Sequence, residues 1–75
     1  MDKQVIWNNI LAERDRQDEK WGKMPRNVPH PEWLSILVEE VGEAAEANNR
    51  HDGAELLNEL IQGAAVIVSW LEDKF

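Results

Sequence analysis

Cysteine is absent from the chain, which excludes disulfide bonds and zinc sites built on thiolates. The sequence also has no apolar run of about 18 residues, the length that a membrane-spanning helix needs. Its opening residues lack the basic start and apolar core of a secretory signal. We therefore expect no membrane span and a cytoplasmic location.

Basic residues are scarce, since eight lysines and arginines stand against fifteen aspartates and glutamates, for a formal net charge of −7. This charge repels DNA, RNA and anionic membranes from most of the surface. Neither a polymeric nucleic acid nor a membrane is an expected partner. A small phosphorylated ligand remains compatible with the charge, because a bound divalent cation reverses the local sign of the field.

The length of 75 residues gives room for one domain, covering residues 1–75, and for no second core. A domain of this size hides only about 60% of the surface that its unfolded chain exposes. Small domains usually gain further stability from disulfides, a metal ion or self-association. With disulfides excluded, oligomerisation or a hard cation bound by oxygen ligands remains.

Apolar residues at helical spacing predict three helices, over about 3–20, 31–49 and 54–73. The segment GKMPRNVPHP, 22–31, contains all three prolines, so residues 21–30 are predicted to form a loop. Asp52 is the expected N-cap of the third helix. No strand pattern or internal repeat occurs, and the expected fold is an all-α antiparallel bundle.

The second helix contains the stretch EEVGEAAEA, residues 39–47, which concentrates like charge among small and apolar residues. Projection at 100° per residue places Glu40 at the edge of the apolar arc, with Glu43 one turn further on beside it. Glu39 and Glu46 complete an acidic flank. Glu40 is therefore not expected to be freely solvated.

The third helix is expected to have a core face, an adjoining strip of mixed character and a narrow exposed face. Its expected core face consists of Leu56, Leu57, Leu60, Ile61, Ala64, Ile67, Val68 and Leu71. The adjoining strip is polar first and then apolar, reading Glu55, Glu59, Gln62, Val66 and Trp70. A narrow face near Asn58, Ala65, Ser69 and Glu72 is expected to be exposed. Three helices cannot cover so wide an apolar surface, so we expect a homodimer with four-helix packing, or a dimer of dimers.

Two ionised carboxylates three or four residues apart on a helix repel each other by roughly 3 kcal/mol at an effective dielectric near 20. Several such pairs in a partly covered groove require protons or a cation. Mg²⁺ suits the residues, because it takes oxygen ligands and is commonly shared between carboxylates and substrate phosphates. The alternative is that EEVGEAAEA is a solvated face of good helix formers.

The spacing of the acids resembles the signature of the MazG-like all-α nucleotide pyrophosphohydrolases. That signature is Glu-x-x-Glu on one helix and Glu-x-x-Asp on the next. Here EEVGE is followed, sixteen residues after Glu43, by ELIQ at 59–62. The stretches ILAERDRQDEKWG, PEWLSILVEEVGEAAEA and ELLNELIQGAAVIVSWLED also look like single-domain phage and bacterial members, so the resemblance covers nearly the whole chain.

The resemblance implies an oligomer that binds Mg²⁺, with Mn²⁺ as a substitute, on its acidic helix faces. It implies hydrolysis of a nucleoside or deoxynucleoside triphosphate to the monophosphate and pyrophosphate. Carried over, Glu40, Glu43 and Glu59 are metal ligands, and Gln62 stands where the family has aspartate. An uncharged amide at this position holds a metal more weakly. The frame from Glu55 to Asn58 is a second match, ranked below the first.

Further roles follow from the chemistry that hydrolysis requires. Glu39 is the candidate general base for the attacking water, because like-charged neighbours raise a carboxyl pKa toward the useful range. Lys20, Arg14 or Arg26 would neutralise the outgoing pyrophosphate. For Arg14, a structural ion pair with a glutamate of the second helix is an equal alternative. Trp21 is a candidate for stacking on a nucleobase, with plain core packing as the alternative.

Two other functions remain open at this stage. One is a catalytically silent helical module for binding or assembly, in which the acids have no chemical role. The other is hydrolysis of a different phosphorylated nucleotide, such as an alarmone. The substitution at Gln62 and the short length favour the silent module.

Overall fold

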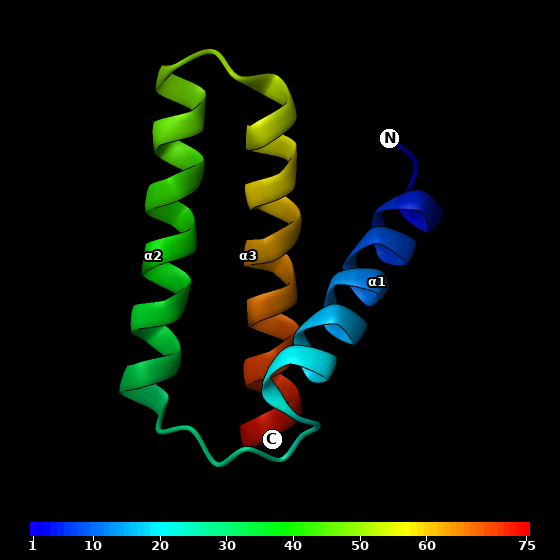
Figure 1. Cartoon of the computed structure of the whole chain (residues 1–75), viewed down its shortest axis with the longest axis vertical. Helices are drawn as coiled ribbons and strands as arrows, with labels where there is room; N and C mark the ends of the chain where they lie inside the picture. Colours follow the sequence, from blue (N-terminus) through cyan, green and yellow to red (C-terminus); the bar gives the residue numbers. More distant parts are fainter.

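The computed structural model describes residues 1–75 and consists of three α-helices without strands, which confirms the expected all-α fold. α1 spans Lys3–Trp21, α2 spans His30–Asn49 and α3 spans Gly53–Lys74. These bounds differ from the expected ones by one residue at most. α2 and α3 lie antiparallel and side by side, whereas α1 meets the C-terminal half of α3 and diverges from it toward the N-terminus (Figure 1).

Local sequence signals set the ends of the helices. The side chains of Asp2 and Asp52 accept hydrogen bonds from backbone N–H groups in the first turns of α1 and α3, as N-caps do. Pro31 lies in the first turn of α2. Backbone N–H groups in the first turn have no acceptor within the helix, so the absence of an N–H in proline costs no hydrogen bond there. α1 stops at Gly22, whose φ of +94° suits a residue without a Cβ atom.

The narrow face of α3 that was expected to be exposed is exposed at Asn58 and Glu72, but α1 covers its middle, at Ala65 and Ser69. Ala65 is 0% exposed and Ser69 is 1% exposed. The prediction is wrong at these two residues because small side chains let a second helix approach closely, and α1 brings polar groups to meet them. Ser69 donates to Gln17 Oε1 at 3.0 Å, and Glu72 accepts from Arg14 Nε at 2.7 Å.

Asp73, near the C-terminal end of α3, holds the connection between α1 and α2. Its carboxylate accepts the backbone N–H groups of Arg26, Asn27 and Val28 at 2.6, 2.8 and 2.9 Å. It also accepts the indole N–H of the buried Trp33 at 2.8 Å. Burial alone would raise the pKa of this carboxyl, but the four donors outweigh it and lower the pKa to about 2.

The core of the single chain is small. Only five apolar side chains are buried: Ile10, Trp33, Ala47, Ala65 and Val66. One side of the α2–α3 pair exposes the large apolar residues Leu34, Val38, Val41, Leu57, Leu60, Ile67 and Leu71, which we call the apolar face. The expected core face of α3 is therefore covered only in part, because no third helix lies against this side (Figure 1).

By length and composition α3 would suffice to cross a membrane, with a mean hydropathy of 1.2 in its most apolar window. Helices that pack in the cores of soluble proteins meet the same criterion, and only 22% of this window is buried within the chain. The structure thus gives no clear membrane span, and the hydropathy of α3 reflects the apolar face.

Candidate metal centre

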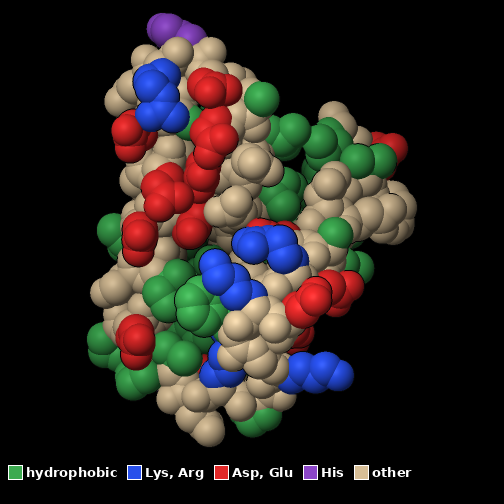
Figure 2. All heavy atoms as spheres, in the orientation of Figure 1, with side chains coloured by type: hydrophobic (Ala, Val, Ile, Leu, Met, Phe, Trp, Pro, Cys, Tyr) green, Lys and Arg blue, Asp and Glu red, His purple; other side chains and the backbone are tan.

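Three glutamates from two helices converge on one point. Glu40 and Glu43 lie on the same face of α2, and antiparallel packing brings Glu59 of α3 against them. One carboxylate oxygen from each can be chosen such that all three lie within 4.8 Å of one another. Figure 2 shows the acidic side chains as a band that follows the α2–α3 pair.

The cluster contains two oxygens without a hydrogen-bond partner. Oε2 of Glu40 and Oε2 of Glu59 are both buried, and no protein donor reaches either of them. Glu59 as a whole is only 7% exposed. Buried carboxylate oxygens are rarely left unsatisfied in native proteins. A divalent cation with oxygen ligands would satisfy both, so this donor set fits Mg²⁺.

The same crowding shifts the protonation of the cluster. Burial raises the pKa of Glu59 to about 8, and the neighbouring carboxyls of Glu43, Glu55 and Glu40 add to the increase. Burial also raises the pKa of Glu40, and the charges of Glu43 and Glu39 add to this increase, against an opposing effect of the neighbouring Glu59 carboxyl. Without a cation, the cluster therefore holds protons at pH values where exposed glutamates are ionised.

The raised pKa of Glu59 predicts how stability depends on pH in the absence of metal. Between the unfolded pKa of 4.5 and the folded pKa of about 8, the folded protein binds more protons than the unfolded chain. Stability must therefore fall as pH rises through this window. We expect the melting temperature in EDTA to be several degrees lower at pH 8.5 than at pH 5.5. Saturating Mg²⁺ should reverse most of this loss at pH 8.5, and a flat profile in EDTA would contradict the assignment.

A cleft of about 570 Å³ opens beside the cluster, between α1, the 22–29 connection, α2 and α3. Glu40 and Gln62 line it on the side of the three-glutamate cluster. Its other lining residues are the cations Arg16, Lys20 and Arg26 and the apolar side chains Trp21, Val28, Trp33, Ile36 and Val66, together with Gln17, Glu32 and Ser69. In Figure 2 several basic side chains lie below the acidic band, next to a patch of apolar side chains.

The remaining acidic and amide candidates lie near the cluster in different ways. Gln62 and Glu40 line the same cleft. Glu39 is exposed and is not a member of the three-carboxylate cluster, although its charge helps to raise the pKa of Glu40. Glu55, which belonged to the lower-ranked frame, lies close enough to Glu59 to raise its pKa.

The basic and aromatic candidates divide into buried and accessible groups. Lys20 and Trp21 both line the cleft, and Lys20 Nζ lies 4.9 Å from the centre of the Trp21 ring. Arg26 lines the cleft too. Arg14 does not, because it is 4% exposed and its guanidinium donates to Glu72, Gln17 and Asp18.

The ion-pair alternative for Arg14 needs correction in one respect. Its partners are Glu72 of α3 at 2.7 Å and Asp18 of α1 at 2.8 Å, and not a glutamate of α2. The reason is the position of α1, which packs against α3 and makes no comparable contact with α2. Loss of either carboxylate partner would leave the buried guanidinium less compensated and would therefore destabilise the chain.

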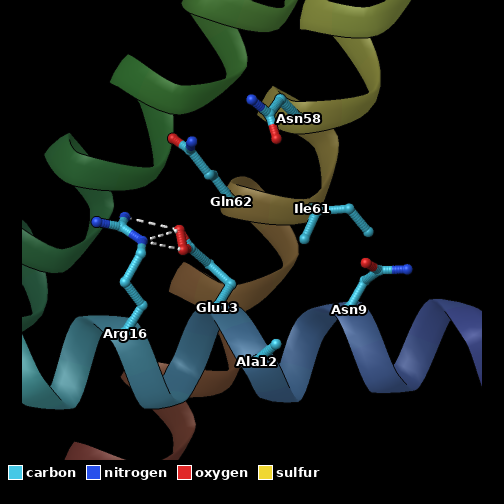
Figure 3. A pocket seen from close by; sticks show the side chains of 7 residues that line it. All are labelled: Asn9, Ala12, Glu13, Arg16, Asn58, Ile61 and Gln62. Atoms are coloured by element: carbon cyan, nitrogen blue, oxygen red, sulfur yellow. Dashed lines mark hydrogen bonds and ion pairs between the residues drawn. The ribbon is translucent and has the colours of Figure 1, made fainter.

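Arg16 is a cation of the cleft that was not among the predicted site residues. Arg16 is bound to Glu13, three residues earlier, and pairs at this spacing are common on ordinary helix surfaces. No signal in the sequence shows that this pair faces Gln62 across the gap between α1 and α3 (Figure 3). Only the packing angle of α1 reveals it.

Comparison of the chain with protein-family models, with curated proteins and with solved structures gives no match. The chemistry of the site therefore rests on the geometry of its own residues.

Proposed function

We propose that the protein is a Mg²⁺-dependent pyrophosphohydrolase of nucleoside or deoxynucleoside triphosphates, active in the cytoplasm. The observation that carries the proposal is the pair of buried, unsatisfied oxygens of Glu40 and Glu59 beside a cleft lined by cations and aromatic rings. The MazG-like spacing of the same glutamates supports it. Neither a polymeric nucleic acid nor a membrane is part of the proposal, because the net charge is −7.

The cleft offers a complementary group for each part of a nucleotide. Trp21 and the apolar residues that line the cleft suit a nucleobase, because stacking between two aromatic rings is favourable. Lys20 and Arg26 suit the phosphates, whose negative charge they offset. The volume of about 570 Å³ lies within the range of small-ligand sites.

The metal would be held by Glu40, Glu43 and Glu59, with the amide oxygen of Gln62 as a neutral fourth donor. When bound, it supplies Lewis acidity toward the phosphate oxygens and a more acidic water. In the reaction, water oxygen forms a bond to the α-phosphorus and the bond to the bridging oxygen breaks. Pyrophosphate leaves with that electron pair. Glu39, beside Glu40 and open to solvent, is the proposed acceptor of the water proton.

The test of the proposal is pyrophosphate release from a panel of nucleoside and deoxynucleoside triphosphates. Each is assayed with Mg²⁺, with Mn²⁺ and with EDTA, using Glu43→Gln as the inactive control. We expect metal-dependent release that the substitution abolishes. No release from any nucleotide, in a folded and oligomeric protein, would reject the proposal.

The proposed enzyme works as a homodimer or a dimer of dimers. The apolar face on α2 and α3 holds a groove of about 300 Å³ that Leu37, Val41, Leu60 and Ile67 help to line. Glu40 and Glu59 line the same groove, so a second copy seated there would also close the metal centre from this side. Exposed apolar surface of this extent marks an interaction site.

Leu60→Glu is expected to dissociate the assembly, because it places a charge in the centre of the apolar face. Leu60 is 56% exposed in the single chain, so the monomer itself should tolerate the change. Sedimentation equilibrium should show the dissociation constant raised by about 100-fold or more. Asn8→Glu, on the exposed surface of α1, is the control.

A dimer and a dimer of dimers are separated by Leu11→Glu. α1 exposes Val5, Trp7 and Leu11, which would supply the second interface of a tetramer. If the wild type is a tetramer, Leu11→Glu should convert it to dimers. If the wild type is a dimer, the molecular mass of the assembly should not change. A wild-type monomer, or an unchanged mass for Leu60→Glu, would show that the apolar face is not an interface between copies.

A catalytically silent assembly module is the second candidate, and the extent of the apolar face favours it. Gln62 favours it as well, because a neutral donor weakens the metal centre. Such a module would assemble normally and would bind no Mg²⁺ at physiological concentration. Hydrolysis of another phosphorylated nucleotide, such as an alarmone, would instead show in the same assay when the panel includes it.

A further inference from the structure

Arg16 combines an accessible guanidinium with a fixed position on α1. Its Nε donates to both carboxylate oxygens of Glu13, at 2.9 and 2.7 Å, and its Nη2 donates to Oε1 at 2.7 Å. The Glu13 side chain is only 9% exposed, whereas that of Arg16 is 57% exposed. One edge of the guanidinium is thus anchored by a nearly buried carboxylate, and Nη1 makes no hydrogen bond within the chain.

The anchored guanidinium lies where two hollows meet. Arg16 and Gln62 both line the 570 Å³ cleft, and both also line a smaller hollow of about 360 Å³ between α1 and α3. Figure 3 shows the Gln62 side chain and the Glu13–Arg16 pair reaching into the same space from opposite helices. Glu40 lines the cleft as well, and its negative charge adds to that of Glu13 in raising the pKa of Arg16.

The other two arginines near the cleft are less accessible than Arg16, and Arg26 lines the cleft with a side chain that is only 18% exposed. Arg14 is buried among its three partners. Arg26 donates through Nε to the carbonyl of Gly22 and through Nη2 to Asp18. Lys20 is accessible and lies one helical turn after Arg16, so the two cations form a short row along the α1 side of the cleft.

We infer that Arg16, oriented by Glu13, binds the phosphate chain of the ligand, opposite the acidic cluster. A polyphosphate would then contact a metal ion held by Glu40 on one side and the guanidinium of Arg16 on the other. Arginine suits this task, because its planar fork binds two phosphate oxygens at once. The inference rests on the proposed function for the identity of the ligand and deepens it by adding a phosphate-binding residue and its positioning partner.

The experiment measures binding rather than turnover. Inorganic tripolyphosphate with Mg²⁺ is titrated into the intact protein by calorimetry, for the wild type, Arg16→Ala, Arg16→Lys and Glu13→Gln. Arg50→Ala is the matched control, because Arg50, the C-cap of α2, also pairs with a nearby glutamate, Glu46, at 3.0 Å, is 53% exposed and does not line the cleft. The two alanine variants change the net charge equally.

We expect Arg16→Ala to weaken tripolyphosphate binding by about 10-fold to 100-fold and Arg16→Lys to restore part of it. Arg50→Ala should stay within about twofold of the wild type. Glu13→Gln should weaken binding by a smaller factor, and Glu13→Gln combined with Arg16→Ala should bind no more weakly than Arg16→Ala alone. Binding of Mn²⁺ alone should change little in Arg16→Ala, which would separate a phosphate contact from damage to the metal centre.

Three results would overturn the inference: no tripolyphosphate binding by the wild type, unchanged binding in Arg16→Ala, or an equal loss in Arg50→Ala. Failure of the proposed function has a different outcome. A wild type that binds tripolyphosphate through Arg16 and hydrolyses no nucleotide would reject the enzyme and keep the contact. Hydrolysis with an unaltered KM in Arg16→Ala would keep the enzyme and reject the contact.

Discussion

Replacing Glu59 by glutamine is expected to abolish Mg²⁺-dependent turnover while making the metal-free protein more stable. The loss follows because Glu59 supplies the most deeply buried carboxylate of the cluster. Changes to residues that merely support metal ligands reduce metal affinity or activity by about 10-fold to 100-fold, so loss of a ligand should reduce kcat/KM by at least about 100-fold. The gain in stability follows because a neutral amide avoids the burial of a charge, which is the main cause of the raised Glu59 pKa of about 8, and also removes the effect of the neighbouring carboxyls.

Three measurements on Glu59→Gln test this pair of effects: pyrophosphate release, Mn²⁺ binding, and the melting temperature in EDTA at pH 8. We expect a melting temperature several degrees above that of the wild type, and a pH profile that is flatter between pH 5.5 and 8.5. Glu19→Gln, an exposed position of α1, is the control for the change in net charge. Turnover at the wild-type level would show that Glu59 is not a metal ligand. An unchanged melting temperature would show that its buried carboxyl does not destabilise the metal-free protein.

Glu59→Gln also distinguishes the proposed enzyme from the silent module, because the two differ in how the substitution changes Mg²⁺ binding. In a silent module the substitution should stabilise the protein, and no Mg²⁺ binding would be lost, because none existed. In the enzyme, saturating Mg²⁺ should stabilise the wild type and leave Glu59→Gln nearly unaffected. The comparison of melting temperatures with and without Mg²⁺ therefore decides between them even before a substrate is found.

The positions of the helices could be predicted from the sequence because their signals are local. The spacing of apolar residues, the cap at Asp52 and the prolines of the connection each act within a few residues of their own position. Glu40, Glu43 and Glu59 were joined into one set through the resemblance to the MazG-like signature, and the antiparallel packing of α2 and α3 places them together in space. The short turn between α2 and α3 enforces that arrangement.

The orientation of α1 could not be predicted in the same way, because it depends on contacts across a longer connection. Helical projection showed Ala65 and Ser69 as a small polar face, and nothing in it indicated that α1 would pack there. Burial of Arg14 was anticipated, but its partner depends on which helix α1 reaches. The Arg16 site was missed for the same reason, since it exists only where α1 crosses α3.

Asp73 is the second position where a single substitution should have a large effect, and no local pattern in the sequence indicates it. Asp73→Asn would place an NH₂ group before four N–H donors that now share one carboxylate. At least one donor must then lose its partner, and Trp33 Nε1 lies where water cannot replace it, since Trp33 is 3% exposed. We expect the melting temperature to fall by about 10 °C or more.

The pH dependence identifies the carboxylate as the cause. Because the folded pKa of Asp73 is about 2, below the unfolded value of 3.8, its contribution to stability is present above pH 3.8 and is lost as pH falls toward 2. Asp73→Asn should lose this part of the acid transition, whereas Asp15→Asn, exposed on α1, should keep it. If the melting temperature of Asp73→Asn stays within about two degrees of the wild type, the connection between α1 and α2 does not depend on this carboxylate.

Loss of the Asp73 contacts should also reach the cleft, because Arg26, Val28 and Trp33 are held by this carboxylate and line the cleft wall. Asp73→Asn should therefore raise KM for the nucleotide more than it lowers kcat, and limited proteolysis should cleave within residues 22–29. Mn²⁺ binding at Glu40, Glu43 and Glu59 should survive, because those residues lie on the α2–α3 pair away from the connection. Weakened metal binding would instead mean that the end of α3 and the metal centre are coupled through the helix itself.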